Sequence, residues 1–333
     1  MAKRVVYLLG ILVSNFGLSA QDPCFNNINQ SLVYLNPSFA GSNEFIRNQT
    51  VYRNQWPNVS GTYVTYNSCV DGYVRLLNAG MALSVISDEQ ARGTLQTTGL
   101  SFAYAQYITL SQKRQIRIIP SLQVSFNKQT LDRGRLNFAD PINSRYGIIW
   151  KNTSSVPSAL NTYYDLSSGV LIDFKRKANI GVSLSNLLQP NISQPENYKL
   201  PIRATIHAAY DIAWGPRANG KVTTLVILQK NYYNFRFNLI NSWDKYNFGL
   251  GYSLNNQFFV YQGNTNKNYN NIIGFIGFTG RRLSMMYSYN QAIDKRFFSN
   301  PIGSHELSLS FGFYRMGCRL PKTSENEQKT GND

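Results

Sequence analysis

Apolar residues alternate with small or polar residues over much of this chain. The alternation is strict in seven runs, at residues 81–85, 100–104, 122–126, 180–184, 248–254, 283–289 and 307–313. Successive side chains of a β-strand point to opposite faces, so a period of two predicts strands. Strand character extends to eight further segments, at residues 45–55, 62–71, 162–173, 203–213, 222–230, 232–240, 257–261 and 270–279. The sequence therefore predicts an all-β fold of about fourteen or fifteen strands.

Two architectures produce this alternation. A soluble sandwich turns its apolar face inward, whereas a transmembrane barrel turns it outward into lipid and keeps a polar lumen. The second face here consists of Gly, Ser, Ala and Gln with few charges, and Tyr and Phe gather at the strand ends. The length allows roughly 22 residues for each of fourteen strands with its connection, which suits membrane-spanning strands. We therefore predict a single antiparallel transmembrane β-barrel of about fourteen strands.

The first twenty residues have the character of a secretory signal. Lys3 and Arg4 precede the apolar stretch 5–13, and Leu18-Ser19-Ala20 ends on a small residue, so we expect cleavage before Gln21. The alternative is a membrane anchor, but this stretch is too short to cross a hydrocarbon core of about 30 Å. An exported protein with a barrel pattern is expected in the bacterial outer membrane.

The rest of the chain divides into three parts. Residues 21–44 are rich in Asn and are expected to form a plug or a short periplasmic lead-in. The barrel is expected over 45–318, with a polar tail at 319–333. The stretch 128–161 is too long for a tight turn and is expected to be an extracellular loop or a lumen insert. Turns between strands are expected at Ser87-Asp88, Asn219-Gly220, Asn255-Asn256 and Gly280-Arg281.

The chain is strongly basic, with 33 Lys and Arg against 17 Asp and Glu. Because export separates it from nucleic acid, the charge favours lipopolysaccharide, anionic lipid or an acidic protein partner. Short basic groups fall where hairpin turns are expected, at Lys113-Arg114, Lys175-Arg176-Lys177 and Arg281-Arg282. We interpret them as solvated turns and anchors at the membrane edge.

Candidate chemistry is sparse. Two His and three Cys leave little for a metal site, and we expect no metal and no cofactor. Neither His207 nor His305 lies in a nucleophile motif, and the acids form no cluster, so we expect no enzyme. Cys24, Cys69 and Cys318 could form one disulfide and leave one thiol over.

Several strings resemble the PorP/SprF family of Bacteroidota outer-membrane proteins. The resemblance is carried by Tyr34-Leu35-Asn36-Pro37-Ser38-Phe39-Ala40-Gly41, Tyr52-Arg53-Asn54-Gln55-Trp56-Pro57, Leu136-Asn137-Phe138-Ala139-Asp140 and Gly303-Ser304-His305-Glu306-Leu307. Three features depart from the family pattern: Cys24 stands where His is common, Arg133 stands where Trp usually follows Leu-Asp, and the chain continues past its last strand.

The resemblance implies a non-enzymatic outer-membrane barrel of the type IX secretion system or its gliding branch. Its partners would be a secreted adhesin or the carboxy-terminal sorting domain of one, other secretion components, and lipopolysaccharide. The barrel would bind or anchor that domain at the cell surface. Two alternatives stay open: a channel for a small or hydrophobic solute, and a soluble exported protein that binds glycans.

Five residues are candidates for partner binding or for the lumen. Arg53, Gln55 and Trp56 lie in the most specific family string. A structural role is the preferred interpretation there, with Arg53 ion-paired inside the lumen and Trp56 closing the first hairpin. Asp88 and Asp140 are expected to cap loops or to face Arg53 or Arg133.

Overall fold

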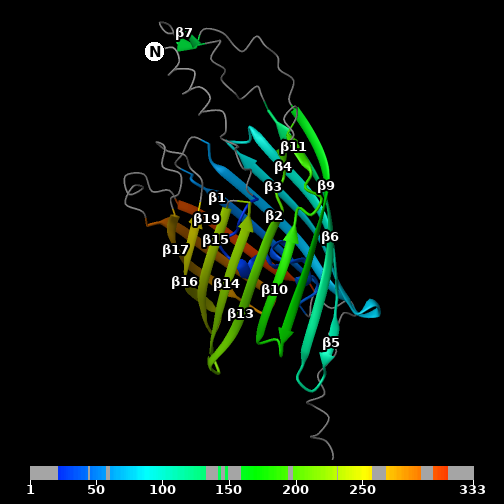
Figure 1. Ribbon diagram of the computed structural model, residues 1–333. Helices are drawn as coiled ribbons and strands as arrows, with labels where there is room; N and C mark the ends of the chain where they lie inside the picture. The colour runs from blue at the N-terminus through cyan, green and yellow to red at the C-terminus, as the bar shows by residue number, and fades with distance from the viewer. Residues whose placement is uncertain are drawn as a thin grey trace, which may run out of the picture.

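The chain forms a closed antiparallel β-barrel of fourteen strands in a computed structural model (Figure 1). The structure describes residues 22–43, 46–57, 61–132, 142–143, 147–148, 159–193, 198–230, 232–256, 268–293 and 303–313. Within these ranges, no helix has the length and apolar character needed to cross a membrane. The expected signal at 1–20 and tail at 319–333 lie outside the described residues.

Each barrel strand pairs with its neighbours along the chain, and the pairing of β1 with β19 closes the ring. The strands are β1 (Arg47–Gln55), β2 (Tyr63–Val74), β3 (Ala79–Gln90), β4 (Leu95–Gln106), β6 (Ile116–Leu131), β9 (Ala159–Phe174), β10 (Ala178–Ser185), β13 (Arg203–Gly215), β14 (Ala218–Gln229), β15 (Tyr232–Trp243), β16 (Tyr246–Asn256), β17 (Asn268–Thr279), β18 (Leu283–Ala292) and β19 (Gly303–Gly312). Short strands lie in the connections: β5 (Ile108–Ser111), β7 (Ile142–Asn143) with β8 (Gly147–Ile148), and β11 (Asn191–Ser193) with β12 (Tyr198–Lys199).

The alternation in the sequence predicted these strands well. Fourteen of the expected segments coincide with the fourteen barrel strands, and the fifteenth, 257–261, lies outside the described residues. Three expected turns are wrong, because Ser87-Asp88 lies inside β3, Asn219-Gly220 lies inside β14, and Asn255-Asn256 forms the last two positions of β16. The lumen face of a barrel strand accepts polar side chains, so a polar residue does not mark the end of the strand as it would in an apolar core.

The apolar face of the strands points out of the barrel. In β3, Leu83 and Val85 are 52% and 46% exposed, whereas Ala82 between strands β2 and β4 is buried. The same outward exposure of large apolar side chains recurs in β4, β6, β10, β16 and β18. A sandwich would bury this face, so the barrel prediction is confirmed.

The two ends of the barrel differ in their connections. One end, called the short-turn end, contains the start of β1, the finish of β19 and six short connections, at residues 75–78, 107–115, 175–177, 216–217, 244–245 and 280–282. The opposite end, called the long-loop end, contains the longest connections, at residues 132–158, 186–202, 257–267 and 293–302. An even strand number brings both ends of the barrel sheet to the same rim.

Pro120 marks a change of partner along β6. Residues from Ser121 onward pair with β4, whereas Ile118 pairs with Ile108 of β5. Proline has no N–H to donate to a ladder and is usually excluded from central strands. Here it occupies the position where one neighbour strand ends and the next begins.

Residues 22–43 lie inside the barrel and are called the lumen segment. The segment contains the 3-10 turns η1 (Ile28–Gln30) and η2 (Pro37–Phe39) on either side of the single helical turn α2 (Leu32–Leu35), which Figure 1 draws in blue within the ring. Its apolar side chains pack against inward-facing wall residues in one core: Ile28, Val33, Leu35 and Phe39 with Tyr73, Ala103, Tyr107, Ile119, Leu171 and Leu225.

The lumen segment leaves the barrel at the short-turn end through a very close approach to the wall. A Cβ on Gly80 would lie 1.8 Å from the carbonyl oxygen of Ala40. Gly41 has a φ of +68°, and a Cβ there would lie 2.7 Å from the Cα of Gly80. Only glycine fits at both positions, because the contacts are with backbone.

Gly80→Ala is expected to destabilise the barrel by about 3 kcal/mol or more, because the new methyl group must displace the backbone of Ala40. The measurement is the temperature at which the folded band converts to the unfolded band on a semi-native gel. Gly274→Ala in β17 is the matched control, since nothing lies within 4 Å of a Cβ there. Equal conversion temperatures for the two variants would contradict this packing.

Candidate functional site

The first contact group of the lumen segment is centred on Glu306 of β19. This side chain is almost completely buried, with 1% exposure. Its carboxylate accepts hydrogen bonds from the backbone N–H of Asn26 at 2.5 Å and of Asn27 at 2.8 Å. Asn26 also donates to Ser304 at 3.3 Å and accepts from Asn290 at 3.2 Å. A charged acceptor therefore fixes the chain as it enters the lumen.

Two buried arginines surround this carboxylate. Arg236 of β15 is 2% exposed and donates to the carbonyl oxygen of Phe25 and to Cys24 Sγ, the latter at 3.4 Å. Arg53 of β1 is 8% exposed and lies opposite Glu306 in the β1–β19 register. Buried cations cost free energy unless anionic charge lies near them, and the Glu306 carboxylate is near enough to interact electrostatically with both arginines.

The second contact group is centred on Asn36, which is fully buried midway through the lumen. Its Nδ2 lies 3.1 Å from His207 Nε2 and 3.3 Å from the carbonyl oxygen of Val182, and its Oδ1 accepts from the Ser38 N–H at 2.9 Å. A Cβ on Gly169 would lie 2.1 Å from the Asn36 Oδ1, so the absence of a side chain at this position of the wall makes room for Asn36. His207 is therefore a packing partner of the lumen segment, as its ring contact with Phe39 also indicates.

The third contact group closes the short-turn end. Asp71 of β2 accepts from Arg47 Nε at 2.9 Å, from Arg47 Nη2 at 3.0 Å and from the Gly41 N–H at 3.0 Å. Tyr107 donates its hydroxyl to the carbonyl oxygen of Ala40 at 2.9 Å. The buried pair of Arg47 with Asp71 thus ties the end of the lumen segment to the start of the barrel sheet.

Tyr34 connects the helical turn α2 to the start of the lumen segment. Its hydroxyl donates to the carbonyl oxygen of Pro23 at 2.7 Å and accepts from Arg203 Nη1 at 3.0 Å. The ring packs edge-on against Phe25, with centroids 5.2 Å apart. Burial raises the pKa of the Tyr34 phenol, against the opposing effect of Arg203, so the hydroxyl stays protonated and donates.

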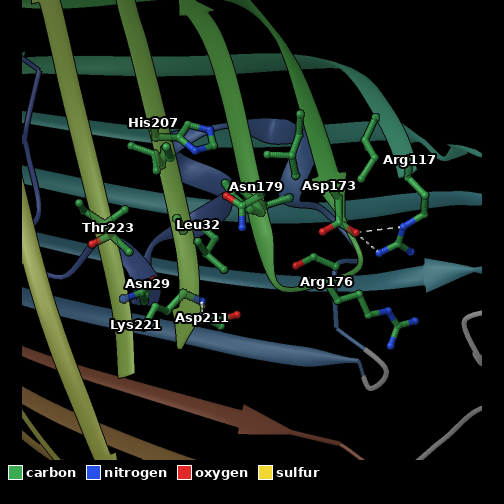
Figure 2. A pocket seen from close by; sticks show the side chains of 18 of the residues that line it. Asn29, Leu32, Arg117, Asp173, Arg176, Asn179, His207, Asp211, Lys221 and Thr223 are labelled. Carbon is green, nitrogen blue, oxygen red and sulfur yellow. Dashed lines mark hydrogen bonds and ion pairs between the residues drawn. The ribbon is translucent and has the colours of Figure 1, made fainter. Parts of the chain in front are cut away.

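A cavity of about 180 Å³ remains between the lumen segment and the wall near the short-turn end. Figure 2 shows two ion pairs beside it, Arg117 with Asp173, and Lys221 with Asp211 at 3.5 Å. Leu32 and Phe39 of the lumen segment cover its apolar side. Ligand pockets usually measure about 300–1,000 Å³. This space suits ordered water or one small group.

The structure places four of the five expected site residues in the long-loop half of the barrel. Arg53 and Asp88 face the lumen, but they do not meet, because Asp88 accepts from Thr65 at 2.6 Å and from Gln90 at 3.0 Å. Gln55 ends β1, and Trp56 follows it with a φ of +58°. The fifth, Asp140, lies outside the described residues, as does Arg133.

Trp56 closes the first hairpin as expected from the sequence. Its N–H donates to the carbonyl oxygen of Gly303 at 2.9 Å, and its ring packs edge-on against Tyr63 with centroids 5.4 Å apart. The residue therefore joins β1 to β19 and β2 at the long-loop rim.

Sequence reasoning missed Glu306, Arg236 and the asparagines that they hold. Glu306 was visible as the one acid in an alternating strand whose other inward positions are serine and glycine, and no other feature of the sequence marked it. The described residues contain no group of three His, Cys, Asp or Glu placed to hold a metal ion. Cys24 and Cys69 are free thiols, and Cys318 lies outside the described residues.

Solved outer-membrane barrels share this architecture. The monoaromatic hydrocarbon channel CymD covers 87% of this chain and 94% of its own length, with 8% identity and a TM-score of 0.53. The Ralstonia pickettii toluene transporter TbuX covers 86% and 94%, with 9% identity and a TM-score of 0.51. At these identities the likeness shows the fold alone. The protein is a β-barrel of the bacterial outer membrane.

The family is narrower than the fold. Residues 17–311 match the sequence profile of the type IX secretion system membrane proteins PorP/SprF, and the chain belongs to that family. A comparison with curated proteins gives no match. In outer-membrane barrels the short turns face the periplasm and the longer loops face outward, which orients this barrel. The lumen segment accordingly begins near the outer face and ends near the periplasm.

Proposed function

We propose that this barrel is a non-enzymatic component of type IX secretion that binds the carboxy-terminal sorting domain of a cognate secreted protein and anchors it at the cell surface. Family membership supports a role in secretion. The filled lumen supports a binding role, and it is the observation that carries the proposal. Three contact groups hold residues 22–43 inside the barrel, from Asn26 at Glu306 to Gly41 at Asp71.

In this proposal the lumen segment is a plug that belongs to the folded state. The segment buries the apolar side chains of Ile28, Val33, Leu35 and Phe39 against the wall, and its removal would expose that core to water. A conduit for a polypeptide needs an open bore. A barrel filled with its own chain instead presents its outer rim to a partner, and loops on a rigid scaffold are common binding sites.

The long-loop rim is the face that we assign to the partner. It contains the four longest connections of the chain, at residues 132–158, 186–202, 257–267 and 293–302. Trp56 lies on the same rim, and tryptophan is enriched among residues that dominate binding energy. Gln55 belongs to the same rim. Arg53 and Asp88 face the lumen instead, and we assign them a role in stabilising the rim.

Trp56→Ala is expected to lower recovery of the secreted partner with the barrel by at least about tenfold, since central aromatic anchors contribute about 2 kcal/mol or more. The measurement is co-purification from native outer membranes in mild detergent, with a heat-shifted band to prove that the barrel is folded. Trp243→Ala at the short-turn end is the matched control, because Trp243 is 62% exposed on the opposite end. Normal surface display of the secreted protein after deletion of the barrel would sink the proposal.

The alternative of a solute channel makes a different demand on the lumen. A channel needs a water-filled path past the lumen segment, and the described cavity of about 180 Å³ lies on one side of it. Conductance of the intact barrel at the level of an open porin would favour this alternative.

A further inference from the structure

The short turns of the barrel are unusually basic. Each of the six short connections carries at least one exposed cation, and together they contain a single acid, Asp244. The set is called the basic collar and consists of Arg75, Lys113, Arg114, Lys175, Arg176, Lys177, Arg217, Lys245, Arg281 and Arg282. Much of the surplus positive charge of the chain is thus concentrated on the rim that faces the periplasm.

Exposed aromatic side chains lie next to this collar, on its membrane side. Trp214, Trp243 and Tyr246 are 62%, 62% and 66% exposed on the outer face of the barrel. Arg217 follows Trp214 by three residues, and Lys245 lies between Trp243 and Tyr246. Amphipathic aromatic rings settle at the level of lipid headgroups. The cations beyond them therefore lie at the depth of the phosphate groups.

The cations are distributed around the whole circumference. They occur in every short turn from β2–β3 to β17–β18, so no side of the rim lacks them. A partner protein would cover one side of the rim and would need positive charge only there. A lipid leaflet surrounds the barrel and contacts every side. The even distribution therefore favours lipid over an acidic protein.

We infer that the basic collar binds anionic phospholipid headgroups of the periplasmic leaflet and selects them over zwitterionic ones. Basic residues close to an anionic membrane surface each contribute a favourable electrostatic attraction. The aromatic belt sets the depth of the barrel, and the collar sets the lipid composition around it. This inference goes beyond the proposed function and does not depend on it.

Two tryptophans make the collar directly observable. The chain has four Trp, and a Trp56→Phe, Trp150→Phe background leaves Trp214 and Trp243 as reporters. This variant is reconstituted in vesicles of equal phosphatidylglycerol and phosphatidylcholine, with bromine on one lipid and then on the other. Bromine quenches fluorescence at short range, so the ratio of quenching gives the local lipid composition. We expect the ratio of phosphatidylglycerol to phosphatidylcholine beside the reporters to exceed the bulk ratio by at least about threefold at low salt.

Neutralising the cations beside the reporters tests the cause. Arg217→Gln with Lys245→Gln is expected to return the local composition toward the bulk ratio, since each cation near an anionic surface is worth about a fivefold preference at most. Lys128→Gln with Lys199→Gln is the matched control, because both are exposed cations toward the long-loop end. A heat-shifted band verifies folding of each variant.

A salt titration of the unneutralised reporter protein provides a second measurement that needs no folded variant. The preference is expected to fall as sodium chloride is raised to about 0.5 M, because the Debye length shrinks to a few ångströms. Quenching that follows the bulk composition at low salt overturns the inference and leaves an acidic protein as the occupant of the collar. A preference that survives both high salt and neutralisation overturns it as well.

Discussion

A chain lacking residues 22–39 is expected to conduct ions across a planar bilayer at least about tenfold better than the full chain. Eight-stranded barrels are filled by their own side chains, whereas barrels of sixteen or more strands leave an aqueous channel. Fourteen strands give a lumen between these limits, and here the lumen segment occupies it. Its removal leaves inward side chains such as Tyr73 and Leu171 lining a wetted bore.

The deletion keeps Ala40 and Gly41, so that the start of β1 and the contact of Gly41 with Asp71 are retained. Its control is the full chain in the same bilayer, with folding of both proteins checked by the heat-shifted band. Equal low conductance of two folded proteins would show that another part of the chain closes the lumen. Equal high conductance would show that the lumen segment does not close it, and would favour the channel alternative.

Glu306→Gln is expected to loosen the entry of the lumen segment while leaving the barrel strands in place. The glutamine has one acceptor oxygen for the two N–H groups of Asn26 and Asn27, and it removes the carboxylate that interacts electrostatically with Arg53 and Arg236. Unsatisfied buried donors and unpaired buried charges cost on the order of 3 kcal/mol. That cost corresponds to about a hundredfold increase in the open population of the segment.

Cys24 reports this opening. The thiol lies 3.4 Å from Arg236 Nη2 and is free, so its alkylation rate follows exposure of the segment. Because Cys24 is only half-buried in the closed segment, we expect its alkylation in the Glu306→Gln variant to rise by less than this factor of about a hundred, as read by peptide mass spectrometry, with the buried Cys69 unchanged as an internal standard. Asp244→Asn in a short turn is the control substitution. An unchanged Cys24 rate would assign the hold on the segment to the groups at Asn36 and Asp71.

The strand pattern could be predicted from the sequence because alternation is a local property. Within each strand, the alternation shows which side chains face lipid. In β3, for example, the apolar Leu83 and Val85 lie on either side of Ser84. The inward position of Arg53 follows from the same alternation once β1 is recognised as a strand. Turn positions were less certain, because Asp88 and Asn219 mark a polar lumen as readily as a turn.

The candidate site was predicted only in part. Arg53 was expected to form an ion pair inside the lumen. The acid across from it, Glu306, lies about 250 residues further along the chain and accepts its hydrogen bonds from Asn26 and Asn27. Closure of β1 on β19 brings Arg53 and Glu306 into register, and no local pattern encodes that closure. Asp88 was expected to cap a loop or to face Arg53 or Arg133, but it accepts a hydrogen bond from Thr65, its neighbour on β2.

The sequence by itself determined the strands, the direction of each face, and through family strings the secretion class. These are properties of short segments, since lipid and lumen select different residues at alternate positions. Only the tertiary structure decided where residues 22–43 lie and what holds them. Asn36 reaches backbone and side chains of β9, β10 and β13, and Asn26 reaches β19, because ring closure gathers distant strands around one axis.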